Sequence, residues 1–246
     1  TSELVEGVTE RALLERAREP YLGANPLVDR ELDIPENAVP VRSDQTGNIQ
    51  YIDIEKLEMI LDKFIGARGI ERTITQIIFP FLEKIGILWL TNHINPAQEH
   101  LVTNIIRQKL IVGIDSIVTS LKVNKTVLLF LPEGEYHELG LLFMNYLLKS
   151  RGVATVYLGS SVPLKDVAYI VKLKKPDYLY SHLTTVGQNF NFDKFISNVT
   201  QNFSDIPVII SGQLTCTYQK KIHAPLNFKR SFPEVMAFVS DLSNPD

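Results

Sequence analysis

The sequence predicts an α + α/β fold, in which a helical bundle is followed by a domain built on a five-stranded parallel sheet. Over residues 51–122 the apolar residues recur three and four positions apart, which is the spacing of amphipathic helices. From about Asn124, short apolar runs alternate with helical stretches, a pattern typical of parallel strands covered on both faces. With a strand order of 2-1-3-4-5, the second domain would have a flavodoxin-like (Rossmann-like) arrangement.

The length and composition are those of an ordinary globular protein. The 246 residues suffice for two modest domains, and 45% of them are hydrophobic while 22% are charged. The formal net charge of −3 argues against a basic surface for nucleic acids. Cys216 is the only cysteine, so a disulfide framework is excluded, and no apolar run reaches the length of a membrane span. We therefore expect a cytoplasmic protein without a signal peptide or membrane contact.

The first 48 residues differ in composition from the rest of the chain. Arginine is the only basic residue up to Arg42, and the first lysine is Lys56. Residues 2–19 have the spacing of an amphipathic helix, and a turn-rich stretch follows. We interpret residues 1–48 as an N-terminal arm and linker. A helical arm, a remnant of an upstream DNA-binding domain and an artificial extension are all compatible with its composition.

Residues 49–122 form the predicted bundle. Pro80 lies inside a helical pattern, where it should kink the helix or split it. Asn95 and Pro96 are residue types preferred at the N-cap and at the first position of a helix, so a new helix should begin there. Three or four helices with short connections make a small bundle.

Residues 123–246 form the predicted α/β domain. Strands are expected over residues 126–131, 154–159, 177–183 and 207–212 and near 226–231. Helices are expected over residues 139–150, 164–174 and 191–202 and from about Pro233. In sheets of this order, ligands bind at the carboxyl ends of the strands, in the crevice where the strand order reverses.

His137 should lie in that crevice, at the tip of the first strand and just before a helix. Glu135 precedes it by two residues, and a carboxylate beside an imidazole fixes the tautomer and raises the basicity of the ring, as in metal ligation. The other four histidines show no metal spacing, which disfavours zinc because zinc needs three or four ligands. A cofactor that brings its own metal needs only one histidine from the protein.

Two other chemistries fit these residues poorly. The loop after the first strand has one early glycine, Gly134, and lacks both common phosphate-binding patterns. Cys216 and Ser181 have no clear base and orienting acid in the sequence, so nucleophilic catalysis is disfavoured. We therefore expect no enzymatic activity.

Three short motifs resemble those of cobalamin-binding domains. Their residues are Glu135, His137 and Gly140 in EYHELG, Ser181 and Leu183 in SHL, and Ser211 and Gly212 in SG. The first resembles the Asp-x-His-x-x-Gly signature with Glu in place of Asp, the second matches the Ser-x-Leu element, and the third falls where that family usually carries Gly-Gly. The resemblance implies that His137 replaces dimethylbenzimidazole as the lower cobalt ligand. It also implies that Ser181 and Gly212 leave room for the displaced nucleotide tail.

The predicted bundle carries a further motif, which resembles one particular family of cobalamin-binding proteins. WLTNHINPAQEH places nine residues between Trp89 and Glu99, and His100 follows directly. Over residues 51–240 the chain resembles the cobalamin-binding sensory region of light-responsive MerR-type transcriptional regulators. The resemblance implies adenosylcobalamin as the cofactor, with Trp89 over the adenosyl group, Glu99 hydrogen-bonded to it and His100 nearby. Light-sensing members carry a histidine directly after the tryptophan, whereas this chain has Leu90, which cannot ligate cobalt.

From these residues we expect a cobalamin-binding sensor module of a transcriptional regulator, which acts through ligand-controlled oligomerisation. A homo-oligomer is expected, and DNA contact only through a domain absent from this chain. A corrinoid carrier protein for methyl transfer is an alternative, because it shares the two-domain plan. A degenerate module that no longer binds cobalamin is another, for which Ser211 and Leu90 are the evidence.

Overall fold

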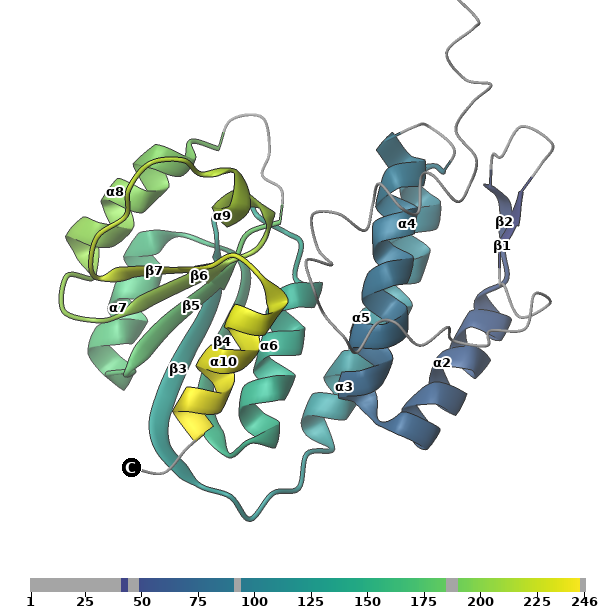
Figure 1. Cartoon of the computed structure of the whole chain (residues 1–246), viewed down its shortest axis with the longest axis horizontal. Helices are drawn as coiled ribbons and strands as arrows, with labels where there is room; N and C mark the ends of the chain where they lie inside the picture. Colours follow the sequence, from purple (N-terminus) through teal and green to yellow (C-terminus); the bar gives the residue numbers. More distant parts are fainter. Residues whose placement is uncertain (1–40, 44–48, 91–93, 185–189, 244–246) are drawn as a thin grey trace, which may run out of the picture. The chain divides into compact units, whose positions relative to one another are not determined.

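The computed structural model describes residues 41–43, 49–90, 94–184 and 190–243 (Figure 1). Most of the predicted N-terminal arm, residues 1–48, therefore lies outside the described residues. The chain divides into two compact units, Thr1–Lys109 and Leu110–Asp246. The division falls within α5 (Pro96–Asp115), the longest helix of the described part.

The described part of the first unit begins with a β-hairpin that was not predicted from the sequence. Strand β1 (Val41–Ser43) pairs antiparallel with β2 (Ile49–Ile52), so Tyr51 lies in a strand and not in a helix. Helix α2 (Ile54–Arg68) begins only after Asp53, whose side chain accepts a hydrogen bond from the Lys56 amide at 2.9 Å. This N-cap fixes the start of the helix, because it satisfies one of the amides that have no partner within the helix.

The helix around Pro80 is interrupted, as the sequence predicted. Helix α3 (Ile70–Thr73) runs into a π-helical turn, η2 (Ile74–Ile78), and then into α4 (Phe79–Leu90). Proline has no amide to donate, and its ring would collide with the carbonyl four residues earlier. The wider π-helical turn directly before Pro80 relieves that collision without ending the helical path.

The predicted helix start at Asn95 is confirmed. Its side-chain oxygen accepts from the Gln98 amide at 3.0 Å, and the Gln98 side chain accepts from the Asn95 amide at 3.0 Å. This reciprocal pair is a capping box at the first turn of α5. Among the described residues of the first unit, the buried apolar ones are Ile52, Leu57, Leu61, Ile74, Ile78, Ile85, Ile94, Val102, Ile105 and Ile106.

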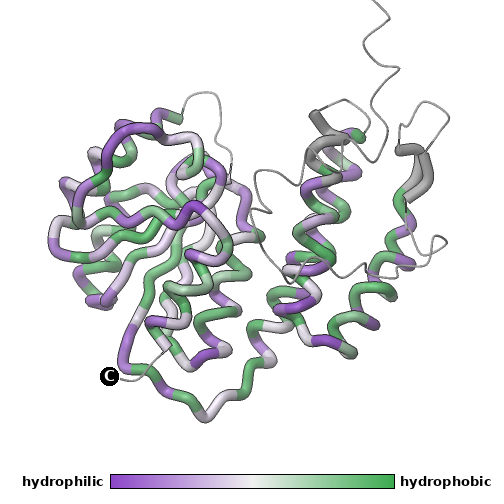
Figure 2. Tube along the Cα trace, in the orientation of Figure 1, coloured by the Kyte–Doolittle hydropathy of each residue, from purple (hydrophilic) through white to green (hydrophobic). Residues whose placement is uncertain are grey.

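The second unit contains a five-stranded sheet in which all neighbouring strands are parallel. Its order is β4-β3-β5-β6-β7, which is the predicted order 2-1-3-4-5. The strands are β3 (Val123–Pro132), β4 (Val153–Val162), β5 (Tyr178–His182), β6 (Val208–Ser211) and β7 (Leu226–Lys229). Figure 2 shows that the sheet of this unit is largely hydrophobic, as expected when both of its faces are covered.

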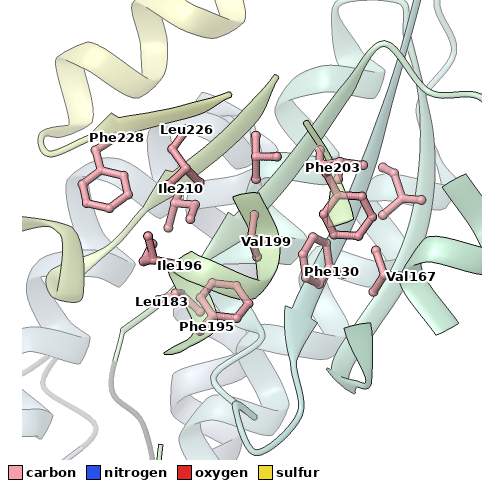
Figure 3. Close-up of a cluster of buried hydrophobic side chains, with 13 residues drawn as sticks. Phe130, Val167, Leu183, Phe195, Ile196, Val199, Phe203, Ile210, Leu226 and Phe228 are labelled. Atoms are coloured by element: carbon pink, nitrogen blue, oxygen red, sulfur yellow. The ribbon is translucent and has the colours of Figure 1, made fainter. Parts of the chain in front are cut away.

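Helices cover both faces of the sheet (Figure 1). They are α6 (Leu139–Ser150), α7 (Leu164–Lys174), α8 (Phe192–Asn202), α9 (Gln213–Thr217) and α10 (Phe232–Ser243). On one face α6 and α10 lie side by side, with the Phe143 and Phe232 rings stacked at 6.4 Å between centroids. The opposite face packs against α7 and α8 through a large apolar cluster (Figure 3). The short helix α9 was not predicted.

The carboxyl ends of β5 and β6 approach each other closely at Gly212. The Leu183 amide donates to the Ser211 carbonyl at 2.8 Å, and the Leu214 amide donates to the Leu183 carbonyl at 3.2 Å. Gly212 has φ of 96°, and a Cβ at this position would overlap the Leu183 backbone, with its nitrogen at 2.9 Å. Glycine is therefore required here both by conformation and by space.

Comparing an alanine at Gly212 with an alanine at Gly134 should separate the requirement for a positive φ from the requirement for space. We expect Gly212→Ala to lower the free energy of unfolding by roughly 2–5 kcal/mol, because it combines backbone strain with an overlap that moves β5 or β6. Gly134→Ala is the matched control, since Gly134 has φ of 86° but a Cβ added there would meet nothing within 4 Å. Urea unfolding of both variants would measure the difference, and equal losses would show that the contact with Leu183 contributes nothing.

Candidate functional site

The predicted site begins with a tight turn at the end of β3. The Glu135 amide donates to the Pro132 carbonyl at 3.0 Å, which closes a four-residue turn. Gly134 is the third residue of this turn and has φ of 86°, as a type II turn requires. The turn points the chain back toward the sheet, so the Glu135 side chain is fully buried at its edge.

Glu135 holds His137 through two contacts to one carboxylate oxygen. Its Oε1 accepts from the His137 amide at 2.8 Å and lies 2.6 Å from Nδ1 of the His137 ring. The imidazole is 60% exposed while the carboxylate is completely buried. A proton on Nδ1 is thus held by the carboxylate, which leaves the lone pair on Nε2, the arrangement that metal-ligating histidines use. The predicted pairing of Glu135 with His137 is confirmed.

Contacts with β4 fix the loop that carries this pair. The Ser161 amide donates to the Glu135 carbonyl at 3.0 Å, and the Gly134 amide donates to the Ser161 hydroxyl at 3.2 Å. The Tyr157 hydroxyl donates to Oε1 of Glu138 at 2.7 Å, just before α6 begins. Bonds on both sides of His137 therefore hold the loop in one position.

Two polar side-chain atoms at this site are buried and have no hydrogen-bond partner within the described residues. They are Oε2 of Glu135 and Oγ of Ser181, and both side chains are 0% exposed. A buried polar atom without a partner costs roughly 1–3 kcal/mol, so such atoms are rare in folded proteins. Both belong to residues that the motifs singled out. They are the atoms to which a bound ligand with polar groups could supply partners.

Gly140 lies in the first turn of α6, directly against the ring of His182. A Cβ at Gly140 would overlap this imidazole, whose Cγ would lie 2.9 Å away. His182 ends β5, and its Nδ1 lies 2.8 Å from the Ser211 hydroxyl at the end of β6. His182 was not among the site residues predicted from the sequence. The signal that could have found it is the register of the two strands, which pairs His182 with Ser211.

Loss of hydration keeps His182 neutral and Tyr180 protonated. Desolvation lowers the pKa of His182 to about 4, and the negative charge of Glu135 offsets only part of this effect. Desolvation also raises the pKa of the Tyr180 hydroxyl, which lies 2.5 Å from the Ser211 hydroxyl. Tyr180 can therefore donate to Ser211, and Ser211 can donate to the neutral Nδ1 of His182. In this order the Tyr180 hydroxyl, the Ser211 hydroxyl and Nδ1 of His182 each have a partner.

The residues of the SHL stretch point to different faces of the sheet. Tyr180 and His182 both reach Ser211, and the Tyr180 ring stacks on Phe238 of α10 at 6.4 Å. Side chains alternate along a strand, so Ser181 faces the opposite side, toward the apolar cluster that contains Leu183. The space beside Gly212 is taken by the Leu183 backbone. The room that the motifs predict for a nucleotide tail stays a prediction.

The predicted residues of the bundle lie around the end of α4 and the start of α5. Trp89 belongs to α4, but its side chain is outside the described part, as is that of Leu90. Glu99 lies in the first turn of α5, and its Oε2 is 3.0 Å from Nδ1 of His100. The Glu99 side chain is 30% exposed and the His100 side chain 71%. The roles of these residues toward an adenosyl group stay predictions.

Among the residues that the structure describes, no group of three or more His, Cys, Asp or Glu side chains could hold a metal ion. This part of the chain also has no helix that is both long and apolar enough to span a membrane.

Comparisons with known proteins agree with the motifs. Residues 49–112 match a family described as a B12 binding domain. The chain is 26% identical over 193 residues to the HTH-type transcriptional repressor CarH of Myxococcus xanthus, covering 76% of this chain and 62% of CarH. It is 22% identical over 199 residues to CarA, an HTH-type transcriptional repressor of the same organism, covering 80% of this chain and 67% of CarA. It thus spans only about two thirds of the length of these relatives.

A solved structure shares the fold. The monomethylamine corrinoid protein of Methanosarcina barkeri matches with a TM-score of 0.59 and 13% identity, over 77% of this chain and 92% of that one. The predicted fold class is therefore confirmed. The family match and the two repressors confirm the predicted resemblance to the cobalamin-binding region of such regulators.

The low pKa of His182 predicts a specific dependence of stability on pH. The folded chain resists protonation of His182 down to about pH 4, whereas the unfolded chain binds that proton near the ordinary pKa of 6.5. The contribution of neutral His182 is thus complete above about pH 6.5 and is lost as the pH falls toward 4. The full difference corresponds to about 3 kcal/mol.

Urea unfolding of the wild type and of His182→Gln, between about pH 7.5 and about pH 4, would measure this effect. The stability of the wild type relative to the variant should decline across that range. Because other ionisable groups titrate in both proteins, only the difference between the two curves is informative. A difference that does not change with pH would contradict the assignment of a desolvated, neutral His182.

Proposed function

We propose that this chain is an adenosylcobalamin-binding sensor module of a transcriptional regulator, without enzymatic activity of its own. The observation that carries the proposal is the pair formed by buried Glu135 and exposed His137 at the carboxyl edge of the sheet. One such imidazole suffices for cobalamin, because this cofactor brings its own cobalt and equatorial ligands. When bound, it would supply a cobalt centre whose upper ligand can be exchanged or lost.

Glu135 prepares His137 for this role. The carboxylate holds the Nδ1 side of the ring at 2.6 Å, so Nε2 keeps the lone pair needed for a lower cobalt ligand. Fixation of the loop to β4 by Ser161 and Tyr157 reduces the freedom that the ring would lose on ligation. The exposed position of His137 leaves it accessible from outside the domain.

The two buried atoms without partners in the described part of the chain fit a bound corrinoid. Oε2 of Glu135 and Oγ of Ser181 can each accept a hydrogen bond, and Ser181 can also donate one. Corrinoids carry amide side chains and a nucleotide tail, which supply both donors and acceptors. We assign Gly140, Leu183 and Gly212 to the same site as positions at which a larger or differently shaped residue would disturb the strand ends.

In the helical unit we assign the upper ligand to Trp89, Glu99 and His100. An indole offers a flat apolar surface for an adenine, and the partly exposed Glu99 carboxylate can accept hydrogen bonds from ribose hydroxyls. The match of residues 49–112 to a B12 binding domain supports a role of this unit in cobalamin binding. These assignments favour adenosylcobalamin over smaller upper ligands.

Regulation would proceed through a homo-oligomer whose stability depends on the ligand. A ligand changes such an equilibrium only if its affinity for the two assembly states differs. DNA would be contacted through a further domain of the regulator, and similarity to two HTH-type repressors supports this arrangement. Leu90 cannot ligate cobalt, so any light response would follow from loss of the adenosyl group and not from a new ligand at position 90.

A corrinoid carrier for methyl transfer is the second candidate, because its two-domain plan and its fold are shared with a corrinoid protein. The presence of Trp89 and Glu99-His100 favours the sensor. The two functions differ in their preferred upper ligand. A sensor of the proposed type should prefer adenosylcobalamin, whereas a carrier should accept methylcobalamin at least as well.

Replacing His137 tests the cobalamin site. We expect His137→Ala to abolish the absorption spectrum of histidine-ligated, base-off cobalamin and to lower the affinity by at least roughly 10–100-fold. Titration of the purified chain with adenosylcobalamin, followed by absorption spectroscopy, measures both. His223→Ala is the control, since His223 is exposed and lies in the same unit. Wild-type affinity in His137→Ala would disprove the assignment of the lower ligand.

Replacing Trp89 tests the upper ligand. We expect Trp89→Ala to weaken adenosylcobalamin binding roughly 5–100-fold, which is the contribution of an aromatic ring stacked on a base. Methylcobalamin binding should change much less, because a methyl group offers no ring to stack on. Dissociation constants for both cofactors, measured for the wild type, Trp89→Ala and Trp89→Phe, give the comparison. An unchanged ratio of the two constants would exclude Trp89 from the upper-ligand site.

A further inference from the structure

The imidazole of His182 occupies the space that a glycine leaves open in α6. A Cβ at Gly140 would lie 2.5 Å from Nε2 of His182 and 2.9 Å from Cγ, so helix and ring are in direct contact. Glycine inside a helix costs roughly 0.5–1 kcal/mol relative to alanine. In this structure that cost is balanced by the packing of a histidine ring, which no other residue at position 140 would permit.

A hydrogen bond to the end of the neighbouring strand holds the ring in that place. Nδ1 of His182 lies 2.8 Å from the Ser211 hydroxyl, which also bonds Tyr180. The strand register places His182 directly beside Ser211. If His182 turned away, Ser211 would keep Tyr180 as a partner. The His182 side chain can thus leave without stranding a buried hydroxyl.

His182 is also the polar side chain of the SHL stretch that faces α6. Ser181 points to the other side of the sheet, as the alternation along β5 requires. Gly140 follows His137 by three residues. Gly140 lies in the first turn of α6, directly after the loop that carries the proposed cobalt ligand, and the His182 ring covers it.

We infer that His182 controls the entry of the nucleotide tail of the corrinoid, because its ring must leave Gly140 and Ser211 before any group can occupy the space beside α6. This inference rests on the proposed cobalamin site. It assigns to His182 a selective role: a corrinoid with a nucleotide tail must displace the ring, whereas a corrinoid without the tail can reach His137 and leave the ring in place.

Association kinetics with two corrinoids test this role. The probes are adenosylcobalamin and adenosylcobinamide, which lacks the nucleotide tail, and binding is followed by stopped-flow absorption. We expect His182→Ala to raise the association rate constant of adenosylcobalamin roughly three- to tenfold, the factor that corresponds to one buried hydrogen bond. The rate constant of adenosylcobinamide should stay close to that of the wild type, because its binding breaks no contact of His182.

Two further variants separate the ring from its hydrogen bond. Ser211→Ala keeps the imidazole but removes its hydrogen bond to position 211. It should therefore also raise the association rate constant of adenosylcobalamin and leave that of adenosylcobinamide unchanged. Tyr180→Phe is the matched control, because it removes the other partner of Ser211 and opens no space beside Gly140. It should not raise the rate constant of adenosylcobalamin, because Ser211 would then lose its remaining partner when His182 leaves, and it should leave the rate constant of adenosylcobinamide unchanged. Thermal unfolding of each variant confirms that the comparison is made between folded proteins.

The outcomes are distinct. If His182→Ala and Ser211→Ala change both corrinoids equally, change neither, or slow adenosylcobalamin, His182 does not control entry of the tail, while the cobalamin site itself stands. If the wild type binds neither corrinoid, the proposed function is wrong and this inference fails with it.

Discussion

The buried carboxylate of Glu135 is the group on which the rest of the site depends. Removing a carboxylate from water is expensive, and its partners must compensate for that loss. One oxygen has two donors from His137, and the backbone on both sides of the residue is fixed by Pro132 and Ser161. The turn, its glycine and the contacts to β4 can all be understood as the means of holding this carboxylate at the edge of the sheet. The orientation of the exposed imidazole follows from them.

In the α/β unit the two helices after the first and second strands could be predicted to the residue, whereas β3 and β4 are each ten residues long where six were expected. Helices over residues 139–150 and 164–174 begin and end where expected, because caps, prolines and changes of period are local signals. The parallel sheet followed from the alternation of strands and helices, and the order 2-1-3-4-5, which was assumed as that of the flavodoxin-like arrangement, agrees with the structure. The hairpin β1–β2, the π-helical turn η2 and the short helix α9 could not be predicted in the same way. Each is short, and its form depends on neighbouring segments more than on its own pattern.

The site could be predicted only where its residues are close in sequence or stand at the tips of strands. The pairing of Glu135 with His137 could be predicted because it requires only a separation of two residues and a turn, and both are visible in the sequence. To predict the contact of His182 with Gly140, one would have to know the register of β5 and which of its residues face α6. A shift by one residue would exchange the faces of Ser181 and His182, and nothing local distinguishes the two phases in a strand buried on both sides.

Ser211 illustrates why a departure from a motif is not by itself evidence of lost function. Its hydroxyl joins Tyr180 and His182, so a polar residue at this position accompanies a polar residue at the end of the neighbouring strand. A domain that had lost its ligand would have no reason to keep buried polar atoms without partners, because apolar replacements would stabilise it. The described part of this chain keeps two, on Glu135 and Ser181, both in motif positions. Buried polar atoms without partners are expected where a fold binds a ligand. Their presence argues against a degenerate module that no longer binds cobalamin.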